Sequence, residues 1–167
     1  MIRQSDFQWD TYWWSAKGQR VPFLPYPVTV TIYNHCERLG TSPDEKVLPT
    51  DRQIEVANAV FQLPVQIVDS MNDVAEMARA ECDEEVCLTD YGLGHINREN
   101  IDQYYRIESI IIPGDCSSSD EHMFFDGECD WEDEHGLRLS LKNGIFVGYS
   151  CQSDGISVQD ISENAVR

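Results

Sequence analysis

The chain has few basic residues and no long apolar run, and both shortages exclude classes of protein. Its 167 residues include 12 Lys and Arg against 30 Asp and Glu, which gives a formal net charge of −18 at pH 7. A surface with this charge repels phosphates and anionic lipid head groups, so we expect no direct binding to nucleic acid or to a membrane. The longest apolar runs, such as Ile110-Ile111-Ile112, are far too short to span a bilayer.

Several short motifs are also missing. The N-terminal residues lack the uninterrupted apolar segment of a signal peptide, so we expect a cytoplasmic protein whose six cysteines are reduced thiols. The cysteine spacing includes no C-x-x-C pair, which argues against a zinc ribbon and against a dithiol redox motif. No G-x-S-x-G, P-loop or H-E-x-x-H motif is present either, and the sequence therefore predicts no catalytic residue.

The acidic residues are unevenly distributed along the chain. Residues 1–40 carry a net charge of +1, residues 41–114 a net charge of −10, and residues 115–167 a net charge of −9. The densest segment, residues 115–135, contains nine carboxylates and no Lys or Arg. Like charges this close repel one another unless they are solvated or meet a positive charge. The available counterparts are a metal ion, a basic protein surface, or water alone.

The first half of the chain predicts strands followed by helices. Aromatic residues and a period-two alternation at 28–33 indicate strands in the N-terminal third, with a turn at 17–19. Two amphipathic helices are expected near 51–62 and 64–82. A capping box formed by Thr50 and Gln53 opens the first helix.

The second half predicts strands again. They are expected at 106–113, 123–129 and 136–149, and the last is a hairpin that turns at Asn143-Gly144. This segregation of helices and strands predicts an α+β fold, a mainly antiparallel sheet with two central helices in the order strands–helix–helix–strands. Residues 1–152 are expected to form a single domain and residues 153–167 a polar tail.

Two groups of acidic residues are the candidates for binding a basic partner protein. The first group lies at the end of the second expected helix, where carboxylates are unfavourable beside the negative end of the helix dipole. The second group lies in the string WEDEHG that starts at Trp131. The candidate residues are Asp83, Glu84, Glu85, Glu132, Asp133 and Glu134.

A metal site in the WEDEHG string is the alternative to partner binding. Zn²⁺ and Mn²⁺ accept mixed shells of histidine and carboxylate ligands, and such a site could be hydrolytic. The candidate ligands are Glu132, Glu134 and His135. In a strand, Glu132 and Glu134 point away from His135. Further ligands would then have to come from elsewhere, for example Asp130, His122 or Asp126. No other cofactor is predicted.

The chain resembles an uncharacterised bacterial family of α+β domains. The most distinctive shared part is C-terminal and runs from Asp130-Trp131 through Glu134-His135-Gly136 to Asn143-Gly144. Some members of this family lie in toxin–immunity neighbourhoods, and the resemblance implies no established active site. Together with the charge, it predicts a non-enzymatic, immunity-type protein that neutralises a basic toxin or another cationic partner. A third hypothesis is a protein that mimics nucleic acid. The net charge supports it equally, but the acidic residues show no phosphate-like spacing.

Overall fold

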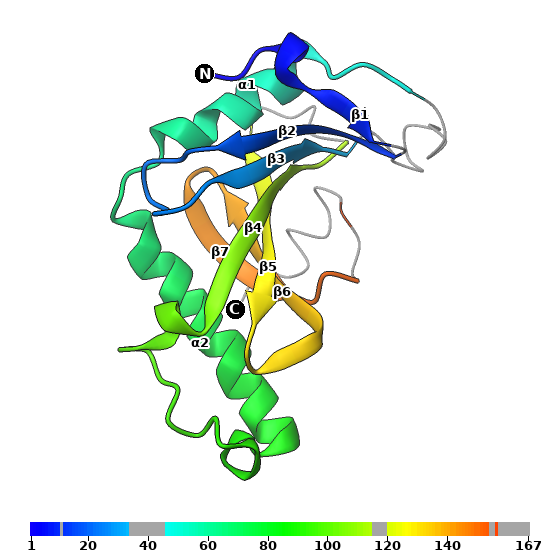
Figure 1. Cartoon of the computed structure of the whole chain (residues 1–167). Coiled ribbons are helices and arrows are strands. Elements are labelled where there is room, and N and C mark those ends of the chain that lie inside the picture. Colours follow the sequence, from blue (N-terminus) through cyan, green and yellow to red (C-terminus); the bar gives the residue numbers. More distant parts are fainter. Residues whose placement is uncertain (11, 34–45, 115–119, 154–155, 157–167) are drawn as a thin grey trace.

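A seven-stranded sheet runs through the centre of the molecule, and two helices cover one of its faces (Figure 1). This computed structural model describes residues 1–10, 12–33, 46–114, 120–153 and 156. The strands lie in the sheet in the order in which they occur along the chain. They are β1 (Gln8–Asp10), β2 (Trp13–Gln19), β3 (Val28–Ile32), β4 (Tyr105–Ile112), β5 (His122–Cys129), β6 (Glu132–Lys142) and β7 (Ile145–Ser150).

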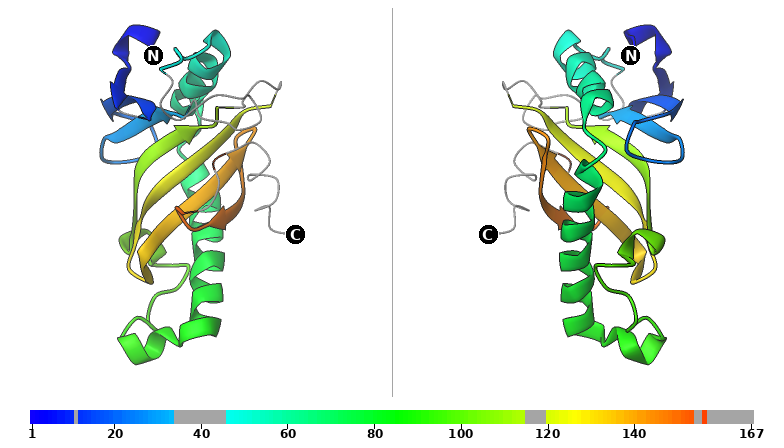
Figure 2. Two further views of the ribbon diagram at one scale, coloured as in Figure 1. Left: turned by 90° about the vertical axis from the view of Figure 1, so that its right-hand side faces the viewer. Right: turned by 90° about the vertical axis from the view of Figure 1, so that its left-hand side faces the viewer.

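Neighbouring strands are antiparallel except for β3 and β4, which are parallel. Parallel neighbours need a long crossover connection, and here the connection contains both helices. The sheet is therefore mainly antiparallel, and this confirms the predicted α+β class. The helices are held on one face because the crossover passes over that face (Figure 2).

The helices differ from the predicted ranges at their ends. α1 (Asp51–Ala59) continues as the 3-10 helix η3 (Val60–Gln62), and α2 (Ile67–Val86) starts three residues after Pro64. The predicted capping box at the start of α1 is confirmed, because Gln53 N donates to Thr50 Oγ1 at 3.2 Å and Thr50 N donates to Gln53 Oε1 at 2.8 Å. No helix in the described part of the chain is long and apolar enough to cross a membrane.

Two sequence-based predictions need correction. Short 3-10 helices interrupt the simple order of strands, two helices and strands. In the part of the chain that the structure describes they are, besides η3, η1 (Gln4–Asp6), η4 (Leu88–Tyr91) and η5 (Ile101–Gln103). The predicted turn at 17–19 is wrong, because these residues belong to β2. Gly18 has a φ of 71° where the pairing of β2 with β3 shifts register, so the glycine accommodates an irregularity within the strand.

The hairpin of β6 and β7 is confirmed. Lys142 pairs with Ile145, and the two residues between them have positive φ, 52° at Asn143 and 76° at Gly144. Both central residues of a type I′ turn require this conformation, which Asn-Gly adopts readily. The predicted polar tail, residues 153–167, lies outside the described residues except for Ser153 and Ile156.

The two faces of the sheet have different compositions. The face toward the helices is apolar, with residues such as Val30, Ile110, Phe125 and Leu139 packed in one core cluster with α1 and α2. The opposite face carries the intervening residues of the same strands, because successive side chains of a strand point to opposite sides. Several of these are polar and buried: Ser15, Thr31, Asp126, Arg138 and Ser140.

Candidate partner-binding site

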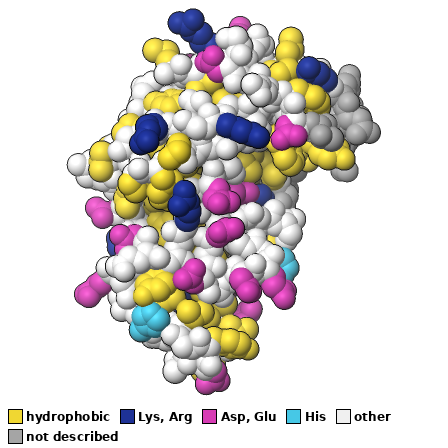
Figure 3. Space-filling view, viewed as in Figure 1, with side chains coloured by type: hydrophobic (Ala, Val, Ile, Leu, Met, Phe, Trp, Pro, Cys, Tyr) yellow, Lys and Arg dark blue, Asp and Glu magenta, His cyan; other side chains and the backbone are white. Residues whose placement is uncertain are grey.

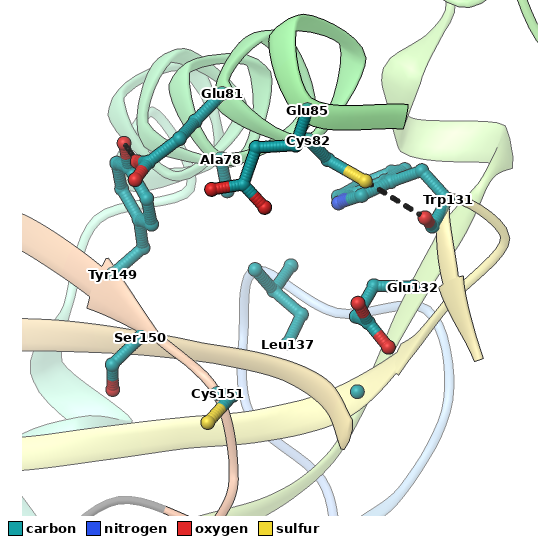
Figure 4. Close-up of a pocket in the computed structure, with 11 residues that line it drawn as sticks. Ala78, Glu81, Cys82, Glu85, Trp131, Glu132, Leu137, Tyr149, Ser150 and Cys151 are labelled. Carbon is teal, nitrogen blue, oxygen red and sulfur yellow. Dashed lines mark hydrogen bonds between the residues drawn. The ribbon is translucent and has the colours of Figure 1, made fainter. Parts of the chain in front are cut away.

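The end of α2 and the start of β6 meet at a pocket of about 510 Å³, the helix-end pocket (Figure 4). The pocket is lined from three parts of the chain that are distant in sequence. The lining residues are Ala78, Glu81, Cys82 and Glu85 of α2; Trp131, Glu132, Gly136 and Leu137 around the start of β6; and Tyr149, Ser150 and Cys151 at the end of β7. In Figure 4 the carboxylates of Glu85 and Glu132 face the space between the helix and the sheet.

Hydrogen bonds from α2 hold the walls of the helix-end pocket in place. The Cys82 thiol donates to the carbonyl oxygen of Trp131 at 3.1 Å, which joins the helix to the turn between β5 and β6. The Tyr149 hydroxyl donates to the carboxylate of Glu81, which joins the helix to β7. Trp131 is buried and packs edge-on against Tyr105, with ring centroids 6.3 Å apart. The pocket is therefore a consequence of how α2 docks on the sheet.

Carboxylates from both predicted groups lie close enough to Cys82 to raise the pKa of its thiol. Burial raises the pKa of the Cys82 thiol, and the nearby charges of Glu132, Glu85 and Asp83 raise it further. Burial likewise raises the pKa of Tyr149 to about 12, together with its hydrogen bond to Glu81 and the charges of Glu81 and Glu84. Burial is the largest cause of both shifts, and the nearby carboxylate charges add to it, so these carboxylates make the local potential more negative.

A second pocket, of about 810 Å³, adjoins the first and shares Glu132 and Gly136 with it. We call it the strand-end pocket. Its acidic lining residues are Glu128, Asp130, Glu132, Asp133 and Glu134. The described residues that line the two pockets include no Lys or Arg. The carboxylates here are therefore not neutralised by a Lys or Arg of the pocket walls.

The predicted partner-binding residues do not all line the two pockets. Glu85 and Glu132 line the helix-end pocket, and Glu132, Asp133 and Glu134 line the strand-end pocket. Glu84 is exposed and lines neither of these two pockets, although its charge raises the pKa of Tyr149.

Asp83 has a structural role at the end of α2. Its Oδ1 accepts a hydrogen bond from Leu88 N at 2.7 Å, and its Oδ2 lies 3.5 Å from Arg79 Nη1. The helix then ends at Cys87, whose φ of 52° lies in the left-handed region. The carboxylate at this position is thus explained by the local backbone, because it satisfies an amide beyond the helix end.

The three metal-ligand candidates are not arranged as a metal site. Glu132 Oε1 lies 3.3 Å from His135 Nδ1, but the same oxygen accepts hydrogen bonds from Glu134 N at 3.1 Å and His135 N at 3.2 Å. Asp126, named above as a further ligand, is paired with Arg138 on the opposite face of the sheet. Among the described residues, no group of three or more His, Cys, Asp or Glu side chains could hold a metal ion.

Two of the cysteines near the pockets, Cys82 and Cys129, are not suited to nucleophilic chemistry. Cys82, Cys87, Cys129 and Cys151 are free thiols. Burial raises the pKa of Cys129 to about 12, and it also raises the pKa of Cys82. Because the thiolate is the nucleophile, these two thiols are unreactive near neutral pH.

Several residues of the two pockets were not predicted from the sequence. Glu81 lies one helical turn before the predicted Glu85, so helical spacing was the signal that could have identified it. Tyr149 could be found only once β7 was placed against α2. Glu128 and Asp130 lie in the acidic segment already noted, but only the turn between β5 and β6 brings them to the strand-end pocket.

One protein-family model matches residues 3–157, and its description is "Domain of unknown function (DUF6985)". The chain belongs to this family. The match confirms the prediction of an uncharacterised domain family. The DUF6985 match includes all seven strands, both α-helices and the residues that line both pockets. No curated protein and no solved structure matches the chain.

Proposed function

We propose that the protein is a non-enzymatic binding protein that captures a basic partner protein through its acidic surface. We define the acidic surface as the carboxylates of the two adjoining pockets: Glu81, Glu85, Glu128, Asp130, Glu132, Asp133 and Glu134. One observation carries the proposal. Carboxylates from α2 and from the start of β6, about fifty positions apart in the chain, line pockets that contain no Lys or Arg among their described lining residues.

The distribution of charge over the molecule supports the same proposal. On the face drawn in Figure 3, most Asp and Glu side chains lie in the lower part of the view, whereas Lys and Arg side chains lie mainly in the upper part. Such a one-sided field steers an oppositely charged protein during its approach and raises the association rate. On this face it also orients the partner, because the acidic part attracts basic groups more strongly than the part that carries Lys and Arg.

The aromatic residues of the helix-end pocket give the proposed interface a fixed framework. Tyr149 is half-buried between α2 and the sheet, and Trp131 is buried beneath the turn. Tyr and Trp are frequent anchors of protein interfaces, and a basic side chain that enters the pocket would contact both aromatic and carboxylate groups. The pocket therefore suits a protruding Lys or Arg of the partner.

An immunity-type role is the more specific form of this proposal. The C-terminal resemblance from Asp130 to Gly144 and the net charge of −18 support it. In this form the protein is bacterial and cytoplasmic, and its partner is a basic toxin whose active surface the acidic surface covers.

The test compares two variants that change charge equally. The surface variant carries Glu85→Gln, Asp133→Asn and Glu134→Gln, all at exposed positions. The control variant carries Glu55→Gln, Glu99→Gln and Asp102→Asn, which are exposed and lie outside both pockets. A nona-arginine peptide is titrated into each protein at several salt concentrations. The peptide is a defined cationic probe that requires no knowledge of the natural partner.

We expect the surface variant to bind the peptide at least about tenfold more weakly than the control variant at low salt, with the loss mainly in the association rate. The difference should shrink as salt screens the charges. Equal weakening of both variants would show that the net charge alone attracts the peptide, and the proposed site would then be wrong.

A further inference from the structure

The face of the sheet opposite the helices carries a groove of about 460 Å³. We call it the hydroxyl groove, after four of its lining residues: Ser15, Thr29, Thr31 and Ser109. It crosses the sheet from β1 to β6 and shares only Gln152 with the two acidic pockets. It is therefore a site separate from the acidic surface.

Strand register brings the four hydroxyl groups together. Ser15 is paired with Thr31 across β2 and β3, and Thr29 is paired with Ser109 across β3 and β4. Each pair lies on the same face because directly opposite residues of neighbouring strands point the same way. Hydroxyl groups both donate and accept hydrogen bonds. The row of hydroxyl groups therefore offers both hydrogen-bond donors and hydrogen-bond acceptors along one wall of the groove.

A buried ion pair lies at the β6 side of the groove. Arg138 Nε donates to Asp126 Oδ1 at 2.8 Å, and Arg138 Nη2 donates to Asp126 Oδ2 at 2.7 Å. Arg138 is 1% exposed and Asp126 is 7% exposed. The two charges neutralise each other within a bidentate contact, so this end of the groove is polar without attracting an ion of either sign.

An aromatic surface lies near the other side of the groove. Trp13 of β2 is 38% exposed, and its ring centroid lies 6.5 Å from that of Tyr33, which follows β3. Both residues line the groove. A large, flat apolar surface is here placed within reach of a row of hydroxyl groups, and the ligand has to match both features.

These features fit an uncharged carbohydrate better than other ligand classes. The C–H face of a sugar ring packs on an aromatic ring while its hydroxyl groups exchange hydrogen bonds with Ser, Thr and charged side chains. A wholly apolar ligand would leave the groove's hydroxyl groups without partners. A nucleotide offers a flat ring, but its phosphates are repelled by the net charge of −18.

We propose that the hydroxyl groove binds a short, uncharged oligosaccharide. Its volume of about 460 Å³ lies within the range of small-ligand sites, roughly 300–1,000 Å³. The ring of one sugar unit packs on Trp13, and its hydroxyl groups bond to the row formed by Thr29, Thr31 and Ser109.

The test uses three neutral disaccharides as probes: maltose, cellobiose and N,N′-diacetylchitobiose. Each is titrated to millimolar concentration while NMR follows the indole N–H signals of the four tryptophans. We expect at least one disaccharide to shift the Trp13 signal in a saturable way and to raise the melting temperature, because a ligand that binds the native state stabilises it. Failure of all three to do so would overturn the proposal.

Three variants localise the binding. Trp13→Ala should weaken binding at least about tenfold, and Thr31→Val, which keeps the side-chain shape, should weaken it roughly 2- to 12-fold. Tyr12→Ala is the matched control, because Tyr12 is 45% exposed beside Trp13 but does not line the groove. Binding that Trp13→Ala leaves unchanged would contradict the proposal, as would tighter binding of adenosine monophosphate than of any disaccharide.

Discussion

The acidic surface and the hydroxyl groove use the same kinds of side chain in opposite ways. In the acidic surface, Glu85, Asp133 and Glu134 are exposed and lie in pockets without a Lys or Arg among the described lining residues. In the groove, the carboxylate of Asp126 is buried and paired with Arg138. A solvated carboxylate acts at a distance, whereas a paired and buried one acts only on what touches it. Under the two proposals, the acidic surface attracts a basic partner at a distance, whereas the hydroxyl groove binds a neutral ligand only through direct contact.

The largest effect is expected from breaking the buried ion pair. Arg138→Met would leave the Asp126 carboxylate buried without its partner, and we expect the free energy of unfolding to fall by about 3–5 kcal/mol. Urea denaturation followed by circular dichroism measures this change. The double variant Asp126→Leu, Arg138→Met should be more stable than the single variant, because no unpaired charge remains. A loss below about 1 kcal/mol would mean that the pair behaves like an exposed one.

A smaller, pH-dependent effect is expected at Tyr149. Tyr149→Phe removes the hydrogen bond to Glu81 and should cost about 0.5–1.5 kcal/mol at neutral pH. The pKa of Tyr149 is raised from 10.0 to about 12 in the folded protein. The protonated phenol is therefore favoured by folding, so its stabilisation is complete below pH 10 and is lost as the pH rises toward 12.

The Tyr149 prediction is checked by urea denaturation of the wild-type and Tyr149→Phe proteins at several pH values. The difference in stability between them should be constant below pH 10 and should disappear toward pH 12. A difference that grows with pH in this range would mean that the hydrogen bond to Glu81 is not what distinguishes the two proteins.

Within the acidic surface, Glu132 and Glu134 should respond differently to truncation. Glu132→Ala removes the acceptor for the backbone amides of Glu134 and His135 at the start of β6 and should cost about 1 kcal/mol. Glu134→Ala removes an exposed carboxylate and should change stability by no more than about 0.5 kcal/mol. Thermal denaturation of the two variants side by side measures the difference. Equal losses of stability would contradict a structural role for the hydrogen bonds that Glu132 accepts at the start of β6.

The smallest effect is expected from salt. Monovalent salt screens the repulsion among the carboxylates, so the melting temperature of the wild-type protein should rise modestly with salt concentration. The surface variant, with three of these charges removed, should be less sensitive to salt than the wild-type protein. The control variant at Glu55, Glu99 and Asp102 separates the local effect from that of net charge. A control variant that is just as insensitive would show that only the net charge matters.

Local sequence signals predicted the local structures well. Thr50 and Gln53 form the capping box because the motif needs only four consecutive positions. Asn143-Gly144 forms the hairpin turn because few other residue pairs tolerate positive φ at both positions. The turn predicted at 17–19 is wrong for a related reason. A glycine permits both a turn and an irregularity within a strand, and only the pairing of β2 with β3 selects the second.

The candidate sites were predicted only in part. The sequence identified Glu85 and Glu132–Glu134 as acidic candidates. It could not show that the Asp83 carboxylate accepts a hydrogen bond from the amide of Leu88. It also could not predict the pair of Asp126 and Arg138. The two residues are separated by twelve positions and meet because β5 and β6 pair in one particular register. A shift of that register by one residue would turn one of the side chains to the other face.

The amino-acid sequence by itself determined the net charge, the α+β class, the helix cap and the hairpin turn, since each depends on composition or on residues close together in the chain. The tertiary structure decided which carboxylates remain exposed and which are paired. It placed α2 beside β6 and β7, and it aligned the hydroxyl groups of three strands in one groove. These outcomes depend on contacts between residues that are distant in the sequence. Such contacts form, and contribute to stability, only when the sheet and the crossover helices pack together.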